Sequence, residues 1–162
     1  MEKKVLILFY SLSGSTKQMA EVIKTCTGAD MVQIVEAQPY PKDFEKMVKK
    51  VNDDRKAGID PAYKPVNVDV ASYDLYFIGT PNWGGEIASP LETFLKDHDF
   101  SGKKILPFLS HGGGGEQNIE ERFAALLPNS TITPAYVSYK DVEHDGLVPF
   151  EEWIYQYAAE IF

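Results

Sequence analysis

A cluster of hydroxyl side chains stands at residues 11–16 (SLSGST), directly after an apolar run and directly before a helical pattern. The run 5–10 (VLILFY) predicts a buried strand, and the apolar residues between positions 19 and 26 have the spacing of one buried helix face. The first turn of a helix carries unpaired N–H groups and the positive end of the helix dipole, which attract an anion. The segment therefore predicts a phosphate-binding loop, made of Ser11, Ser13, Gly14, Ser15 and Thr16.

The composition of this loop excludes three other kinds of site. It lacks the Gly-Lys-Ser/Thr ending of a P-loop, and its single glycine is too few for a dinucleotide fingerprint. It also lacks the carboxylates that would hold Mg²⁺ at the end of the first strand. With these three kinds of site excluded, the loop suits a ligand with a single terminal phosphate. The alternative is an ordinary polar turn in which Ser13 or Ser15 caps the helix.

Two further loops follow predicted strands in the same way. The apolar runs 74–79 and 104–109 read as buried strands, and each is followed by a loop rich in glycine and small polar residues. In a parallel sheet with helical crossovers, the carboxyl ends of these strands meet at one edge and form a ligand crevice. The candidate ligand-binding residues there are Thr80, Pro81, Asn82, Trp83, Gly84, Gly85 and Glu86 in one loop, and Ser110, His111, Gly112, Gly113 and Gly114 in the other.

With these motifs the chain resembles the flavodoxin-like family, particularly its short-chain FMN-binding branch. The resemblance rests on residues 11–16, 79–83, 89–95, 102–104 and 110–115, which follow one another in the family's order. It implies an α/β fold with three layers, in which a doubly wound, five-stranded parallel sheet has the strand order 2-1-3-4-5. It also implies that residues 11–16 hold the FMN phosphate, while residues 80–86 and 110–115 enclose the flavin ring. Members of the branch often carry a second tryptophan after the first, where this chain has Gly84.

The rest of the chain predicts the scaffold of a single domain over residues 1–162. A second strand is expected at 31–35 and a second helix over 40–51, followed by an irregular excursion to residue 66. The pattern Ser89-Pro90-Leu91-Glu92 predicts a capping box at the start of a third helix. A fourth helix at 119–127, an edge strand at 131–139 and a closing helix at 150–161 complete the fold.

Bulk composition narrows the class of protein. The net charge of −8 argues against a nucleic-acid partner and suits docking on basic redox proteins. The one cysteine, Cys26, is expected as a small core residue, and His98, His111 and His144 lack the spacing of a metal site. The chain shows no signal peptide or membrane-spanning run, so we expect a cytoplasmic protein without a membrane partner.

Three functions stay open on the sequence. The first is an electron carrier with low-potential FMN, the second an FMN-dependent reductase that uses NAD(P)H and quinone-like acceptors, and the third a flavin-free binding domain. Neither ring-binding loop contains Lys or Arg to hold a dinucleotide's phosphates, which favours the carrier. No side chain is expected to act as a catalytic group, although Glu86 and His111 are expected to tune the flavin's potential or relay a proton.

Overall fold

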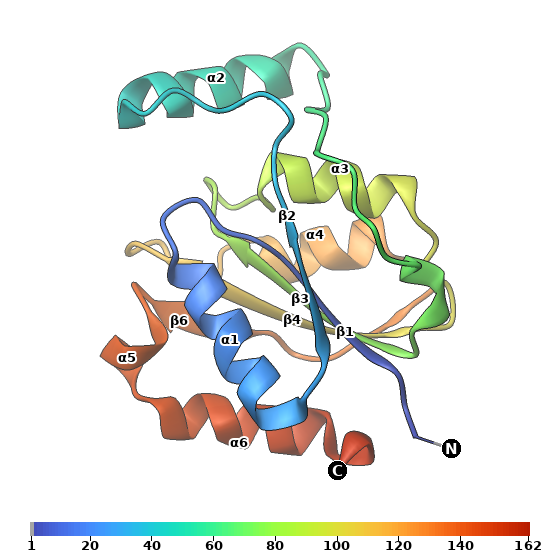
Figure 1. Cartoon of the computed structure of the whole chain (residues 1–162). Coiled ribbons are helices and arrows are strands. Elements are labelled where there is room, and N and C mark those ends of the chain that lie inside the picture. Colours follow the sequence, from blue (N-terminus) through green and yellow to red (C-terminus); the bar gives the residue numbers. More distant parts are fainter. Residues whose placement is uncertain (1) are drawn as a thin grey trace.

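The computed structural model describes residues 2–162, which form a parallel sheet with helices on both faces (Figure 1). The order β2-β1-β3-β4-β5, with β6 also beside β4, confirms the predicted doubly wound topology. All strand pairs within this sheet are parallel, so the carboxyl ends of its strands share one edge. The strands are β1 (Val5–Tyr10), β2 (Asp30–Ile34), β3 (Leu75–Pro81), β4 (Lys104–His111), β5 (Thr131–Ile132) and β6 (Tyr136–Tyr139).

The last edge of the sheet is broken where one strand was predicted over 131–139. β5 pairs with the start of β4 and β6 with its end, and Pro134 lies between them. Proline has no N–H to donate to the ladder, so the pairing is interrupted there. The carbonyl of Pro134 accepts a hydrogen bond from the indole N–H of Trp153 at 3.1 Å.

The helices cover the two faces of the sheet and bury two separate apolar clusters, since side chains alternate along each strand. One face carries α1 (Ser15–Thr27), α5 (Val142–Asp145), α6 (Leu147–Tyr157) and η2 (Ala159–Ile161), and the other carries α3 (Ser89–Asp97), α4 (Ile119–Leu126) and η1 (Val70–Ser72) (Figure 1). Cys26, expected in the core, is only partly buried at the edge of one cluster. No helix within residues 2–162 has the length and apolar content needed to cross a membrane.

Helix α2 (Phe44–Lys56) departs from the doubly wound pattern, in which a crossover helix packs against the sheet. It lies beyond the carboxyl ends of the strands, at the top of Figure 1. An antiparallel bridge between Glu36 and Tyr63 closes the base of this α2 arm (residues 36–63). The irregular chain after the arm covers the sheet instead, because Val66 and Val68 pack against the core there.

The capping predictions for the second and third helices also need correction. The second helix begins at Phe44 rather than near residue 40, because the side chain of Asp43 accepts the N–H of Lys46 at 3.0 Å. The third helix begins at Ser89 with proline in its first turn, as predicted, but Ala88 is its N-cap and the expected capping box is absent. The carboxylate of Glu92 is bound by Arg122 instead, which removes it from the helix N-terminus.

Candidate functional site

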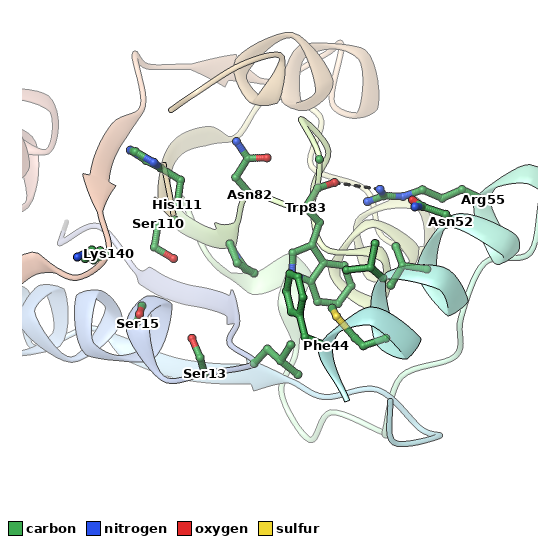
Figure 2. Close-up of a pocket in the computed structure, with 17 residues that line it drawn as sticks. Ser13, Ser15, Phe44, Asn52, Arg55, Asn82, Trp83, Ser110, His111 and Lys140 are labelled. Carbon is green, nitrogen blue, oxygen red and sulfur yellow. Dashed lines mark hydrogen bonds between the residues drawn. The ribbon is translucent and has the colours of Figure 1, made fainter. Parts of the chain in front are cut away.

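The three predicted loops meet at the carboxyl edge of the sheet and enclose, together with α2, a cavity of about 620 Å³ (Figure 2). This volume lies within the usual range of small-molecule sites, about 300–1,000 Å³. The predicted residues that line the cavity are Ser13, Ser15, Pro81, Asn82, Trp83, Gly84, Ser110, His111 and Gly112. Three segments far apart in the sequence therefore contribute to one ligand site.

The hydroxyl loop leaves its helix N-terminus open. Gly14 is the N-cap of α1 at φ 105°, a left-handed conformation that suits glycine, and it has no side chain with which to cap the helix. The Oγ of Ser11 accepts the N–H groups of Gly14 at 3.1 Å and of Lys17 at 3.2 Å, which fixes the turn. The hydroxyls of Ser13 and Ser15 have no partner within residues 2–162, so the capping role considered for them is not what the structure shows.

The first loop is tied to the third by two buried hydroxyls. The Oγ1 of Thr16 lies 3.0 Å from the Oγ of Ser110, at the start of α1 and the end of β4. Lys140, which follows β6, reaches the same part of the cavity and was not predicted. Figure 2 shows Lys140 on the same side as Ser13, Ser15 and Ser110. Its ammonium group adds a positive charge to a loop whose own donors are uncharged.

The second loop is a tight turn held by Asn82. The side chain of Asn82 accepts the N–H of Gly85 at 2.7 Å and donates to the carbonyl of Gly115 at 2.7 Å, which connects the two ring-side loops. Gly84 and Gly85 have φ values of 68° and 83°, which residues with a Cβ rarely adopt. At Gly84 the turn therefore places bare backbone next to the cavity.

Trp83 is the aromatic wall of the cavity, and its ring is fixed from two sides. The rings of Tyr10 and Tyr40 meet it edge-on, with centroids 5.2 Å and 5.5 Å away. Burial raises the pKa of Tyr40 to about 12 and that of Tyr10 higher still, with the carboxylate of Glu36 adding to both effects. Both phenols are therefore neutral at physiological pH.

His111 organises the glycine-rich third loop. Its Nδ1 accepts the N–H groups of Gly113 at 3.0 Å and Gly115 at 3.1 Å. In a neutral imidazole this arrangement places the proton on Nε2. The contact supplies a structural reason for histidine at this position, and its role in proton transfer stays a prediction.

Arg55 connects the α2 arm to the ring-side loop. Its guanidinium donates to the carbonyl of Trp83 at 2.9 Å and to that of Ile87 at 3.4 Å (Figure 2 shows the first bond). Burial lowers its pKa, while the carboxylates of Glu86 and Glu92 act in the opposite direction. Arginine stays charged in proteins, so the loop carbonyls face a permanent cation.

Glu86 lies outside the cavity walls. Its carboxylate forms an ion pair with Arg122 at 2.7 Å, so its charge is partly compensated. The other predicted residues that do not line the cavity are Ser11, Gly14, Thr16, Thr80, Gly85, Gly113 and Gly114. Several of them shape the loops: the Oγ1 of Thr80, for example, accepts the N–H of Ala88 at 2.9 Å.

The wall contributed by α2 was not predicted. Besides Lys140, the unpredicted lining residues are Leu12, Phe44, Met47, Val48, Val51, Asn52 and Arg55. The apolar ones among the α2 residues show a helical period, which indicates a buried face but not whether that face meets a sheet or a ligand. Lys140 stands far along the chain from the loop it approaches, and no motif marks it.

The sequence profile of the flavodoxin family matches residues 4–155, nearly the whole chain. The chain belongs to the flavodoxin family. A flavoprotein from Lactobacillus acidophilus NCFM, solved in complex with FMN, is 29% identical to this chain, with 88% of this chain and 97% of that one covered and a TM-score of 0.72. A protein from Bacteroides eggerthii DSM 20697 (24% identity, 97% and 99% covered, TM-score 0.81) and a flavodoxin from the domain Archaea (18%, 98% and 98%, TM-score 0.61) share the fold.

Proposed function

We propose that this flavodoxin-family protein binds FMN non-covalently and transfers electrons through it. The observation that carries the proposal is the N-terminus of α1, where the hydroxyls of Ser13 and Ser15 and the N–H of Ser15 have no partner among residues 2–162 and belong to the same cavity wall as Lys140 and Trp83. The FMN complex of the similar Lactobacillus acidophilus flavoprotein supports the same ligand. Bound FMN supplies reversible uptake of one or two electrons, and the protein supplies its position and electrostatic surroundings.

The residues at the two parts of the cavity suit the two parts of FMN. The hydroxyls of Ser13 and Ser15, together with the N–H group of Ser15, offer three donors without partners among residues 2–162. A phosphate dianion satisfies such donors and interacts favourably with the helix dipole and with Lys140. The indole of Trp83 and the backbone of the ring-side loops offer a flat surface that a flavin ring matches.

We favour the role of an electron carrier that docks on basic partner proteins. The net charge of −8 attracts such partners and opposes the addition of electrons to the site, which lowers the reduction potential. A dinucleotide needs free cations for its phosphates. In the described part of the cavity wall, Arg55 is engaged by two carbonyls and Lys140 stands at the hydroxyl loop.

A reductase acting on NAD(P)H and quinone-like acceptors is the second candidate. The observation that favours it is the exposed apolar surface beside Trp83, where the side chain of Phe44 is 75% exposed. Anaerobic mixing of the FMN-loaded protein with NADPH or NADH separates the two roles. A carrier keeps its flavin absorbance, whereas bleaching within seconds, followed by turnover with a quinone, identifies a reductase.

FMN binding itself is tested by titrating the flavin-free protein and following tryptophan fluorescence. We expect quenching that saturates at one FMN per chain, because Trp83 lines the cavity. The quenching should shrink in Trp83→Phe and persist in Trp153→Phe, since Trp153 lies in the core with its N–H bound to Pro134. A protein whose fluorescence and flavin spectrum stay unchanged on mixing does not bind FMN, and the proposal then fails.

A further inference from the structure

The glycine-rich third loop depends on one side chain for the hydrogen bonds of its backbone N–H groups. The Nδ1 of His111 accepts the N–H groups of Gly113 at 3.0 Å and Gly115 at 3.1 Å. Among the described residues, no other hydrogen bond holds a backbone N–H of residues 112–115. Consecutive glycines have great conformational freedom, so such a segment needs these bonds to keep one shape. His111 therefore holds the loop in the cavity wall, to which Gly112 belongs.

Only a neutral imidazole can make both bonds. Neutral histidine offers one ring nitrogen as an acceptor, whereas both nitrogens of the imidazolium carry a proton and donate. Protonation of His111 at Nδ1 therefore sets an N–H against two backbone N–H groups, and both hydrogen bonds are lost. Histidine is the side chain whose charge ordinarily changes between pH 5 and 8.

We propose that His111 is a positioning residue and an acid-sensitive switch: its neutral form holds the third loop against the flavin ring, and its protonation releases the loop and lowers the affinity for flavin. The proposal rests on the proposed function for the identity of the ligand. The hydrogen bonds between His111 and the loop are formed by the chain alone, so the switch itself can be tested separately.

The side chains nearest to His111 are aromatic or basic. The ring of Tyr139, at the end of β6, lies 5.4 Å from the imidazole, measured between centroids. The ammonium group of Lys140 lies over the same tyrosine ring, and the ring of His144 on α5 lies 5.0 Å from it. A positive charge on His111 therefore gains nothing from these neighbours that would replace the two hydrogen bonds.

The carboxylates at the ends of the neighbouring elements are engaged elsewhere. Glu116 accepts a backbone N–H of α4, Asp141 caps α5, and Glu86 pairs with Arg122. None of the ion pairs formed within residues 2–162 involves His111. Protonation thus costs the loop two hydrogen bonds and forms no ion pair in return, which favours the released loop.

The switch is tested by titrating the flavin-free protein with riboflavin between pH 8 and pH 5. Riboflavin is the probe because a phosphate such as that of FMN itself changes charge near pH 6. We expect the affinity to fall by about tenfold over this range, since two hydrogen bonds are lost. His111→Asn should bind riboflavin within about threefold of the unchanged protein at pH 8 and show a flat profile, because its amide oxygen can accept the same N–H groups and does not titrate.

Two further variants complete the test. His111→Phe has no acceptor, so it should bind riboflavin weakly at every pH. His144→Asn is the matched control, because His144 is exposed, contacts the same tyrosine ring and does not line the cavity. It should keep the pH dependence of the unchanged protein. In NMR spectra of the isotope-labelled, flavin-free protein, the amide signals of Gly113 and Gly115 should shift together as His111 titrates, and should not shift in His111→Asn.

Several results would overturn the proposal. These are a flat profile in the unchanged protein, a pH dependence that persists in His111→Asn, full affinity in His111→Phe, or glycine amide signals that do not respond to the titration of His111. If the unchanged protein binds neither riboflavin nor FMN at any pH, the proposed function fails instead. The amide signals of Gly113 and Gly115 then decide whether His111 holds the loop.

Discussion

Replacing Ser13 by alanine tests the phosphate role of the hydroxyl loop most directly. The Ser13 hydroxyl lines the cavity, lies at an exposed position and has no hydrogen-bond partner within residues 2–162. Ser13→Ala therefore removes one donor to a phosphate without breaking a bond that the folded protein needs. A hydrogen bond to a charged group contributes about 1.5–3 kcal/mol.

At about 1.4 kcal/mol per tenfold in affinity, this loss weakens FMN binding by about 10- to 150-fold. Riboflavin has the same ring but no phosphate, so its affinity should stay within about twofold. The free energy of unfolding should change by less than about 0.5 kcal/mol, since an exposed side chain without partners is removed. Calorimetric titration with both flavins measures the first two quantities, and urea unfolding of the flavin-free protein measures the third.

Ser101→Ala is the control, because Ser101 is an exposed serine in the turn before β4, at the opposite edge of the sheet from the cavity. It should leave both flavin affinities unchanged. The reasoning is refuted if Ser13→Ala weakens riboflavin and FMN equally, which would mean that the loop acts on the ring. It is also refuted if FMN binds Ser13→Ala as tightly as the unchanged protein.

Three other predictions concern stability. Arg55→Met leaves two loop carbonyls without their donor, so we expect the free energy of unfolding in urea to fall by about 1–3 kcal/mol. Arg55→Lys lacks the guanidinium fork, so the stability of this variant should lie between those of Arg55→Met and the unchanged protein. Gly79→Ala would place a Cβ 2.2 Å from the buried ring of Phe108, so the melting temperature should drop and the added change Phe108→Leu should recover part of the loss. Burial raises the pKa of Tyr76 to about 12 from 10.0, so its contribution to stability is complete below pH 10 and is lost as the pH rises towards 12. Unfolding free energies between pH 9 and 12 should fall by up to about 1.4 kcal/mol per pH unit from this tyrosine, and Tyr76→Phe should flatten that slope; an equal slope in the variant would contradict the assignment.

The sequence determined the sheet and the three loops at its carboxyl edge. Short apolar runs such as 5–10 and 104–109, each followed by a polar or glycine-rich loop, are typical of strands buried on both faces of a sheet, and such sheets are usually parallel. Parallel strands bring the segments that follow them to one edge, whatever their separation in the chain. The local sequence pattern alone therefore predicts that Ser13, Trp83 and His111 lie around one cavity, as they do in the structure.

Only the tertiary structure decided what completes that cavity. The apolar period of α2 predicts a helix with one buried face, but the identity of the opposing surface depends on long-range packing, and here it is a cavity wall. The ends of helices likewise depend on which partners compete for a side chain: the carboxylate of Glu92 pairs with Arg122 instead of forming the expected capping box. Lys140 lines the same cavity as the hydroxyl loop because β6 pairs with the end of β4, a contact between residues distant in sequence. The spacing of residues along the chain does not predict such contacts, since they arise from how the elements pack.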